Sequence, residues 1–450
     1  MKTIAAISTP MGHGGISIVR VSGEDALNIV MKNFVPKRKG NIKPYSLKFG
    51  NFIDEQGKVL DQVLISFFKA PNTYTGEDIC EVNCHGGLII TKRILEVLLN
   101  NGATLAEPGE FTKRAFLNGK MDLTQAEAVI DLINSKSEKE SKLSSKQLEG
   151  FLGNKINEIK AGIIDLLVDI EANIDYPEYD LEEVKNENIS TVLGKAVDSL
   201  ISLEKSFDSG KMIKEGISTA IVGKPNVGKS SLLNALLREN RAIVTDIAGT
   251  TRDTIEEHIT IKGVPLKLVD TAGIRDTDDV IENIGIEKSR RTIEEAELIL
   301  LLLDAVNGIS DEDMELIGLI KDKKHIVIIN KIDSGKLANS ECLKDEEYIE
   351  ISAKTGAGIN ILEDKILDLF NAGNLDVDDG FFITNERHRE LVNKARLGLE
   401  NALNSVNLGM PLDMLSIDIQ NAIQKLGEIT GEEVSEDVIK GIFAKFCLGK

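Results

Sequence analysis

The stretch Gly223-Lys224-Pro225-Asn226-Val227-Gly228-Lys229-Ser230-Ser231 decides the fold of the central part of the chain. The apolar run at 217–222 before it predicts a buried strand, and the leucine-rich run at 232–237 after it has the spacing of a helix. A strand, a glycine-rich loop and a helix in this order are the context that a phosphate-binding loop needs. Backbone N–H groups in such a loop surround a phosphate chain, and the helix N-terminus adds a partial positive charge.

Two side chains at the end of this loop point to nucleotide chemistry. We expect the ammonium of Lys229 to reach the outer phosphates and the hydroxyl of Ser230 to bind Mg²⁺. A chance glycine turn is the weaker interpretation, because the pattern is long and stands between a strand and a helix. The sequence therefore predicts a nucleotide-binding P-loop.

Three further motifs follow apolar runs in the same region. The first, Asn330-Lys331-Ile332-Asp333, ends in a carboxylate that accepts two N–H groups from guanine, which adenine does not offer. Ser352-Ala353-Lys354 follows the next run, and Asp270-Thr271-Ala272-Gly273 fits a sensor of Mg²⁺ and the γ-phosphate. These four signatures in this order resemble those of the Ras-like GTPases, which implies a P-loop domain with a mostly parallel sheet and helices on both faces.

Composition and length set the broad class of the protein. The 450 residues predict two or three domains, and a formal net charge of −20 argues against broad, charge-driven binding to nucleic acid. No apolar run reaches the length of a membrane span, and the N-terminus lacks a secretory pattern, so we expect no membrane contact. The four cysteines (Cys80, Cys84, Cys342, Cys447) have no disulfide-framework spacing, which favours a reducing compartment and a cytoplasmic protein. Cys80 and Cys84, with no evident set of four metal ligands, are interpreted as half-buried strand residues.

The remaining segments differ in character on the two sides of the GTPase motifs. Residues 1–118 alternate strand-like runs at 4–8, 15–21, 47–53 and 59–68 with turns, and 88–99 has helical spacing, so we predict an α+β domain. Helical periodicity dominates 119–210 and returns in 377–450. Each helical piece alone is too short for a good core, so we predict one split helical bundle domain with the GTPase domain, 211–376, inserted.

Further stretches extend the resemblance to essentially the full length of the chain. They are Ala248-Gly249-Thr250-Thr251-Arg252-Asp253 in the GTPase domain, and 15–20, 74–78 and 118–128 near the N-terminus, together with the terminal Cys-Leu-Gly-Lys. With the domain order, they resemble the family of tRNA modification GTPases called MnmE or TrmE. The family implies a multidomain α/β protein whose N-terminal domain is similar to the folate-binding domains of one-carbon enzymes.

The resemblance also implies partners and a second site. The family forms homodimers through the N-terminal domain and a heterotetramer with the flavoprotein MnmG, which together add an aminomethyl-type group to carbon 5 of the wobble uridine of certain tRNAs. The one-carbon unit would come from a 5-formyl- or methylene-tetrahydrofolate. Arg20, Glu77, Lys120 and Lys450 match the family's folate-site positions, and Cys447 maps to the pterin site, although composition alone favours a frayed tail. FAD would belong to the partner, because this chain has no dinucleotide fingerprint, and tRNA would be contacted largely through the complex.

The hydrolytic step needs a group that positions water. Ras-like enzymes often carry a glutamine directly after Asp-x-x-Gly, but this chain has Ile274 there. Arg252 and Arg275 are alternatives as arginine fingers, although exposed ion pairs are the commoner fate of such residues. On sequence alone Glu282 reads as a solvated helix start. The resemblance makes it the leading candidate for orienting the attacking water.

In this family a K⁺ ion takes the place of an arginine finger, and charge on the phosphate oxygens is where a cation helps most. Asn226, Thr245, Ile247 and Thr250 would surround K⁺ with oxygen atoms, and Thr251 would join Ser230 on Mg²⁺. The residues expected to bind GTP are Asn226, Val227, Gly228, Lys229, Ser230, Ser231, Thr245, Asp246, Ile247, Ala248, Gly249, Thr250, Thr251, Asp270, Thr271, Ala272, Gly273, Asn330, Lys331, Asp333, Ser352, Ala353 and Lys354.

Two other functions compete with K⁺-activated hydrolysis in tRNA modification. One is a dimerisation-controlled GTPase switch in assembly or signalling, with a structural N-terminal domain. The other is a folate-dependent transferase whose GTPase domain is decorative, which four intact GTPase motifs make the weaker hypothesis. Folate binding distinguishes the tRNA modification enzyme from the GTPase switch. The effect of Lys229→Ala on modified tRNA tests the transferase hypothesis.

Overall fold

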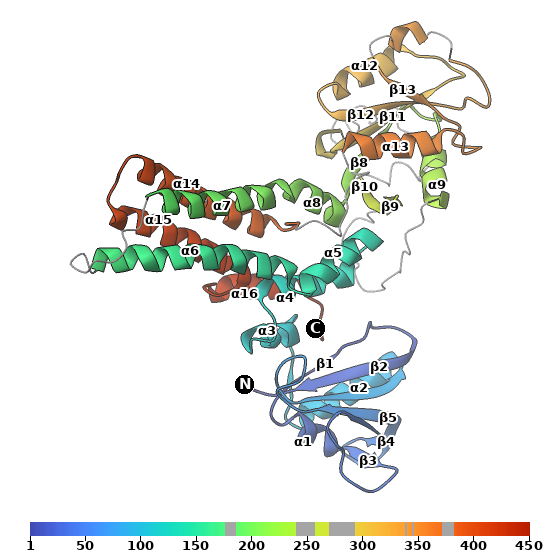
Figure 1. Cartoon of the computed structure of the whole chain (residues 1–450). Helices are drawn as coiled ribbons and strands as arrows, with labels where there is room; N and C mark the ends of the chain where they lie inside the picture. The colour runs from blue at the N-terminus through green and yellow to red at the C-terminus, as the bar shows by residue number, and fades with distance from the viewer. Residues whose placement is uncertain (176–185, 240–256, 270–292, 338–339, 344–345, 371–381) are drawn as a thin grey trace.

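The computed structural model describes residues 1–175, 186–239, 257–269, 293–337, 340–343, 346–370 and 382–450 (Figure 1). It contains a sheet-and-helix region at the N-terminus, a bundle of long helices, and a second sheet-and-helix region that carries the GTPase motifs. The predicted multidomain α/β architecture, with its helical bundle and an inserted P-loop region, is confirmed. No helix within the described residues is long and apolar enough to cross a membrane.

The N-terminal region is built on a seven-stranded sheet with the order β3-β4-β5-β6-β2-β1-β7. All neighbouring strands are antiparallel except β1 and β7. Helices α1 and α2 share one apolar core with the inward residues of the sheet. The elements are β1 (Ile4–Ile7), β2 (Gly14–Ser22), α1 (Ala26–Met31), β3 (Phe34–Pro36), β4 (Ser46–Ile53), β5 (Val59–Phe68), β6 (Ile79–Gly86), α2 (Leu88–Asn100), β7 (Thr104–Leu105) and α3 (Glu110–Leu117).

The strands and the helix expected in this region are present, with ends that differ by at most one residue. Cys80 and Cys84 lie in β6, so the interpretation as strand residues is confirmed, but their side chains are 0% and 3% exposed and are therefore fully buried rather than half-buried. The missed elements are short: α1, β3, β7 and α3 have six, three, two and eight residues. Such segments carry too little periodicity to be recognised in a sequence.

The helical bundle draws its core from both sides of the GTPase motifs. Four long helices pack against one another in pairs, α6 with α7 and α15, and α14 with α7 and α15. Ile163, Leu200, Leu399 and Ile419, one from each of these helices, are fully buried in one cluster. The helices of the bundle are α4 (Leu123–Asn134), α5 (Glu138–Leu148), α6 (Phe151–Asp175), α7 (Asn186–Lys205), α8 (Phe207–Glu215), α14 (Glu386–Asn407), α15 (Leu412–Thr430) and α16 (Glu436–Phe443).

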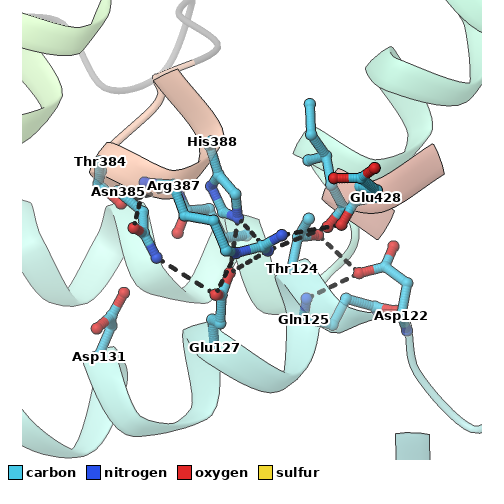
Figure 2. A network of polar contacts seen from close by, with 12 residues as sticks. Asp122, Thr124, Gln125, Glu127, Asp131, Thr384, Asn385, Arg387, His388 and Glu428 are labelled. Carbon is cyan, nitrogen blue, oxygen red and sulfur yellow. Dashed lines mark hydrogen bonds and ion pairs between the residues drawn. The ribbon is translucent and has the colours of Figure 1, made fainter. Parts of the chain in front are cut away.

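A buried polar network joins α4 to the first turn of α14 (Figure 2). The carboxylate of Glu127 accepts hydrogen bonds from Arg387 Nε and Nη2, both at 3.1 Å, and from Asn385 Nδ2 at 3.3 Å. His388 Nε2 lies 2.6 Å from the same carboxylate. Glu127 and His388 are 7% and 3% exposed, so the network lies inside the bundle. It therefore fixes the point at which the chain re-enters the bundle after the GTPase motifs.

The second sheet carries the GTPase motifs. Its six strands have the order β13-β12-β11-β8-β10-β9, and all neighbours are parallel except β9 and β10. Apolar residues of β11 alternate between two cores, one shared with α9 and α13 and the other with α12, so helices cover both faces. The elements are β8 (Ile217–Val222), α9 (Lys229–Glu239), β9 (Glu257–Ile261), β10 (Val264–Leu268), β11 (Leu298–Asp304), α12 (Asp311–Ile320), β12 (Lys324–Asn330), β13 (Tyr348–Glu350) and α13 (Ile359–Leu369).

Helix α8 connects the bundle to this sheet. It runs through the proposed boundary between 210 and 211 and is followed almost directly by β8. Lys214 of α8 pairs with Asp131 of α4 at 2.7 Å, which anchors the connecting helix to the bundle. The sequence change used to place this boundary therefore falls within a helix.

The end of the chain returns to the N-terminal region. Phe443 and Phe446 pack in a small core with α4, and the last residues then pass beside α3 and β1 (Figure 1). Gly109 N–H donates to the Cys447 carbonyl at 3.4 Å, and Phe111 N–H donates to a main-chain oxygen of Lys450 at 3.2 Å. Composition alone favours a frayed tail, but these contacts hold it in place.

Candidate functional site

The loop between β8 and α9 adopts a conformation that depends on glycine. Gly223 and Gly228 have φ of 151° and 103°, in the region that favours glycine. A Cβ at Gly228 would lie 2.3 Å from Asn330 Nδ2, so a larger residue would clash with the neighbouring motif. Asn226 also has a positive φ, 64°, which asparagine tolerates better than most residues. The conformation of the loop therefore depends on glycine at 223 and 228.

Lys229 is directed back across this loop. Its Nζ donates to the carbonyls of Gly223 and Lys224 at 2.7 and 2.9 Å. Burial lowers the pKa of Lys229, because a charged ammonium loses solvation there. A phosphate oxygen is a stronger partner for this ammonium than two neutral carbonyls. The residue predicted to reach the outer phosphates therefore lies at the loop.

The Asn330–Asp333 motif is bonded directly to the phosphate loop. Asn330 Nδ2 donates to the Val227 carbonyl at 2.9 Å, while its Oδ1 accepts from Ala353 N–H at 3.0 Å. Lys331 Nζ donates to the Asn226 carbonyl at 2.6 Å. Three of the predicted motifs, far apart in the chain, thus meet at the carboxyl ends of the parallel strands, where open α/β sheets bind ligands.

Asp304, at the end of β11, is a member of this site that the sequence did not reveal. Its carboxylate accepts from Lys331 Nζ at 2.8 Å, from Val306 N–H at 2.9 Å and from Asn307 Nδ2 at 2.9 Å. Burial alone would raise the pKa of Asp304, but these hydrogen bonds outweigh it and lower the pKa. The sequence marks Asp304 only as a single carboxylate at the end of a run of apolar residues.

Asp333 and Ser352 lie together as the guanine hypothesis requires. Ser352 Oγ donates to Asp333 Oδ1 at 2.6 Å, and Ser334 Oγ donates to Oδ2 at 3.0 Å. These two hydrogen bonds lower the pKa of Asp333, so the carboxylate is an acceptor at neutral pH. Asp333 and Ser334 line a pocket of about 370 Å³. Its lining residues are Gly228, Ser231, Asn234, Ala235, Asn330, Lys331, Asp333, Ser334, Ala353 and Lys354.

Several predicted residues lie outside the described part of the chain. They are Thr245, Asp246, Ile247, Ala248, Gly249, Thr250, Thr251, Asp270, Thr271, Ala272, Gly273 and Glu282, with the alternatives Arg252 and Arg275. Their roles in holding Mg²⁺ and K⁺ and in positioning water remain predictions.

A second polar site lies between β2, β6 and the tail of the chain. Arg20 Nε donates to Glu81 Oε1 at 2.9 Å, across directly opposite positions of the two strands. The guanidinium carbon of Arg20 is 5.8 and 5.6 Å from the ring centres of Tyr74 and Phe111. Burial and the charge of Arg20 lower the pKa of Lys450, although Cys447 and Glu81 oppose this. The structure thus brings Arg20 and Lys450 together, and Glu81, Tyr74 and Phe111 join them.

Of the other predicted folate-site residues, Glu77 lies on the loop before β6, and Lys120 lies between α3 and α4 with its side chain against that loop. The Glu77 carboxylate accepts from Ser22, two residues after Arg20 on β2, at 2.8 Å. Lys120 Nζ donates to the Pro71 carbonyl at 2.9 Å, and its side-chain carbons lie 3.5 Å from the Cβ position of Gly76. Cys447 is exposed. Glu81 was missed because its pairing with Arg20 depends on strand register.

The sequence of the chain matches two protein families along most of its length. Residues 3–120 match the family described as "GTP-binding protein TrmE N-terminus", and residues 123–447 match "MnmE helical domain". The chain is 50% identical to the tRNA modification GTPase MnmE of Acetivibrio thermocellus, over 100% of this chain and 99% of that protein. The protein of the same name from Thermoanaerobacter pseudethanolicus is 48% identical, with the same coverage.

Solved structures similar to this chain match a smaller part of it. Era of Aquifex aeolicus bound to GDP·AlF₄⁻ is 33% identical and covers 40% of this chain and 66% of its own, with a TM-score of 0.27. The G domain of the T. maritima FeoB iron transporter is 26% identical and covers 34% of this chain and 98% of its own, with a TM-score of 0.26.

Proposed function

The chain belongs to the MnmE family of tRNA modification GTPases, and from this premise we propose that it is a K⁺-activated GTP hydrolase that modifies wobble uridine. Together with the flavoprotein MnmG, it would add an aminomethyl or carboxymethylaminomethyl group to carbon 5 of that base in certain tRNAs. The one-carbon unit comes from a 5-formyl- or methylene-tetrahydrofolate bound at the second site.

The observation that best supports GTP as the substrate is the pocket at the strand ends. Lys229 stands in the chain between Gly228 and Ser231, which both line the pocket, and Asp333, which accepts a hydrogen bond from Ser352, lines it as well. An ammonium suits the phosphates, and a carboxylate acceptor suits the N–H groups of guanine. The pocket thus offers complementary groups to both ends of GTP.

Metal ions fit the residues near the loop. Ser230 is the second residue of α9, directly after Lys229, and its hydroxyl is of the hard-oxygen type that Mg²⁺ prefers. Ser230 and Thr251 would hold Mg²⁺, while Asn226, Thr245, Ile247 and Thr250 would hold K⁺. These cations supply positive charge beside the phosphates, where negative charge develops during hydrolysis.

Glu282 is proposed to orient the attacking water, because the position after Asp-x-x-Gly holds Ile274, which has no polar side chain. The test is GTP hydrolysis by the full chain in KCl and in NaCl at equal ionic strength, with Glu282→Ala measured alongside. We expect hydrolysis to be at least tenfold faster in KCl, and we expect the variant to lose most of that rate while still binding GTP.

Equal rates in the two salts would contradict the K⁺ cage. Arg252→Ala and Arg275→Ala would then be compared, since an arginine finger is the alternative source of positive charge. A Glu282→Ala variant with an unchanged rate would remove Glu282 from the mechanism and leave the K⁺ result standing.

The folate proposal is supported by the chemistry of the second site. A tetrahydrofolate carries anionic carboxylates and a pterin whose flat pyrimidine ring bears N–H donors. Arg20 and Lys450 offer cations to the first, and Glu77 with the partly buried ring of Tyr74 offers an acceptor and a stacking surface to the second. Arg20→Ala and Lys120→Ala are each expected to weaken binding of 5-formyltetrahydrofolate measured by calorimetry.

The partners follow the same reasoning. We propose a homodimer formed through the N-terminal sheet, a heterotetramer with MnmG that carries the FAD, and contact with tRNA largely through that complex. A net charge of −20 agrees with tRNA binding that depends on a partner rather than on this chain's own charge. A protein that acts on tRNA with these partners works in the cytoplasm.

A further inference from the structure

Arg114, on α3, is a nearly fully buried arginine between two carboxylates. It is 4% exposed, and a charge at such a position must be paired to be tolerated. Its Nη1 donates to Oε1 and Oε2 of Glu77 at 3.1 and 3.0 Å. Its Nη2 donates to Glu110 Oε1 at 2.7 Å, one helical turn earlier on α3. The guanidinium thus binds Glu77 of the second site through Nη1 and Glu110 of its own helix through Nη2.

Glu77 is held from other directions as well. Ser22 Oγ donates to Oε2 of Glu77 at 2.8 Å. The main chain of Glu77 is fixed by Thr73 Oγ1, which donates to its carbonyl at 2.6 Å, and by Thr75 Oγ1, which accepts from its N–H at 3.2 Å. These contacts leave the carboxylate in one orientation between β2 and α3.

The carboxylate of Glu77 nevertheless keeps capacity for a ligand. A carboxylate has about four acceptor positions, and Arg114 occupies one on each oxygen while Ser22 occupies a second on Oε2. One position remains on Oε1, and the side chain is 16% exposed. An N–H donor of a bound molecule can therefore reach it.

We propose that Arg114 is a positioning residue of the tetrahydrofolate site: it holds Glu77 so that Oε1 faces an N–H donor of the pterin ring. This inference rests on the proposed folate function. Arginine suits the task because its planar guanidinium fixes the direction of each hydrogen bond, whereas a lysine ammonium would supply charge without that geometry. The guanidinium acts only through Glu77 and touches no ligand itself.

The competing interpretation is that Arg114 only stabilises α3. The contact with Glu110 offers a matched control, because it belongs to the same guanidinium but does not involve Glu77. If Arg114 only stabilised α3, Glu110→Gln and Arg114→Gln would both lower the melting temperature, and neither would change the affinity for the ligand. A positioning role separates the two variants.

The test measures binding of 5-formyltetrahydrofolate to the full chain by calorimetry, with the melting temperature recorded for each variant. We expect Arg114→Gln and Glu77→Gln each to weaken binding at least tenfold, and the double variant to be no weaker than either alone, since one contact is lost in all three. Arg114→Lys should recover part of the affinity, and Glu110→Gln should remain within twofold of the native chain.

Three outcomes would overturn the inference. They are native affinity in Arg114→Gln, additive losses in the double variant, and an equal loss in Glu110→Gln. If Arg114→Gln fails to fold, Ser22→Ala removes the other side-chain donor to Glu77 with a small change in volume, and native affinity in that variant would count against the inference. A native chain that does not bind the folate at all would instead overturn the proposed function, and the inference with it.

Discussion

At the scale of single residues, the nucleotide site is organised by charges that neutralise one another at strand ends. Lys331 connects the Asn226 carbonyl of the phosphate loop to the buried carboxylate of Asp304. Asn330 connects the same loop to Ala353. These contacts fix the loop before any nucleotide binds, so less ordering is needed when it does.

The contribution of Asp304 can be measured directly. In Asp304→Ala, Lys331 loses its carboxylate partner and the phosphate loop loses one support. We expect GTP affinity to fall about tenfold, which corresponds to about 1.4 kcal/mol. The measurement is titration with a fluorescent GTP analogue at fixed Mg²⁺, and Asp322→Ala, an exposed aspartate, is the control. Native affinity in Asp304→Ala would show that Lys331 holds the loop without it.

At the scale of elements, α4 and the start of α14 are joined through Glu127, although 260 residues separate it from Arg387 (Figure 2). Burial alone would raise the pKa of Glu127, but the charges and hydrogen bonds of His388 and Arg387 outweigh it and lower the pKa to about 2. A buried carboxylate with several donors is costly to leave incomplete. The network therefore makes the position of α14 depend on α4.

Replacing this carboxylate tests the dependence. Glu127→Gln removes the counter-charge of Arg387 inside the bundle and the carboxylate that faces His388, and we expect the unfolding free energy of the bundle to fall by about 3 kcal/mol at pH 7. The measurement is urea unfolding followed by circular dichroism. Glu436→Gln, whose side chain is 89% exposed, is the control and should change little.

The same network predicts a pH dependence. Because the pKa of Glu127 is lowered in the folded state from 4.5 to about 2, its stabilisation is present above pH 4.5 and is lost as the pH falls towards 2. The difference in unfolding midpoint between the native chain and Glu127→Gln should therefore shrink across this acid range. If the difference in unfolding midpoint stayed constant down to pH 2, the stabilisation by Glu127 would come from packing and not from its charge.

At the scale of the whole molecule, one face of the N-terminal sheet presents apolar side chains to solvent. Leu47, Phe49 and Leu64 are 66%, 47% and 43% exposed, and Phe49 and Leu64 are directly opposite on β4 and β5. The other face of this sheet is covered by α1 and α2. A contiguous exposed apolar patch is typical of an interaction surface, and it agrees with the homodimer that we propose.

Charges placed on this patch should separate the dimer. We expect the double variant Leu47→Glu and Phe49→Glu to have half the native mass in solution, since two like charges on each copy would face each other. The measurement is light scattering after size exclusion. Ile361→Glu, at a position 62% exposed on α13, is the control and should leave the mass unchanged. A double variant with the native mass would place the interface elsewhere.

The sequence by itself determined the fold class and the motifs that form the candidate nucleotide site. The phosphate loop needs only a short run with particular glycines between a strand and a helix, and the apolar run at 217–222 suffices to predict a buried strand. Periodicity likewise predicted the long helices, because the apolar residues of an amphipathic helix recur every three or four positions within one continuous segment. The metal-binding and water-positioning residues outside the described ranges remain predictions.

Only the tertiary structure decided which residues meet. The pairs Asp304–Lys331, Arg20–Glu81 and Arg114–Glu77 depend on strand order, register or the docking of α3, none of which periodicity records. The same holds for Glu127 and Arg387, because a helical pattern shows which face is apolar but not which helix covers it. The conformation of a local motif can be predicted from consecutive residues. The partner of a buried charge is determined only when elements distant in the sequence pack together.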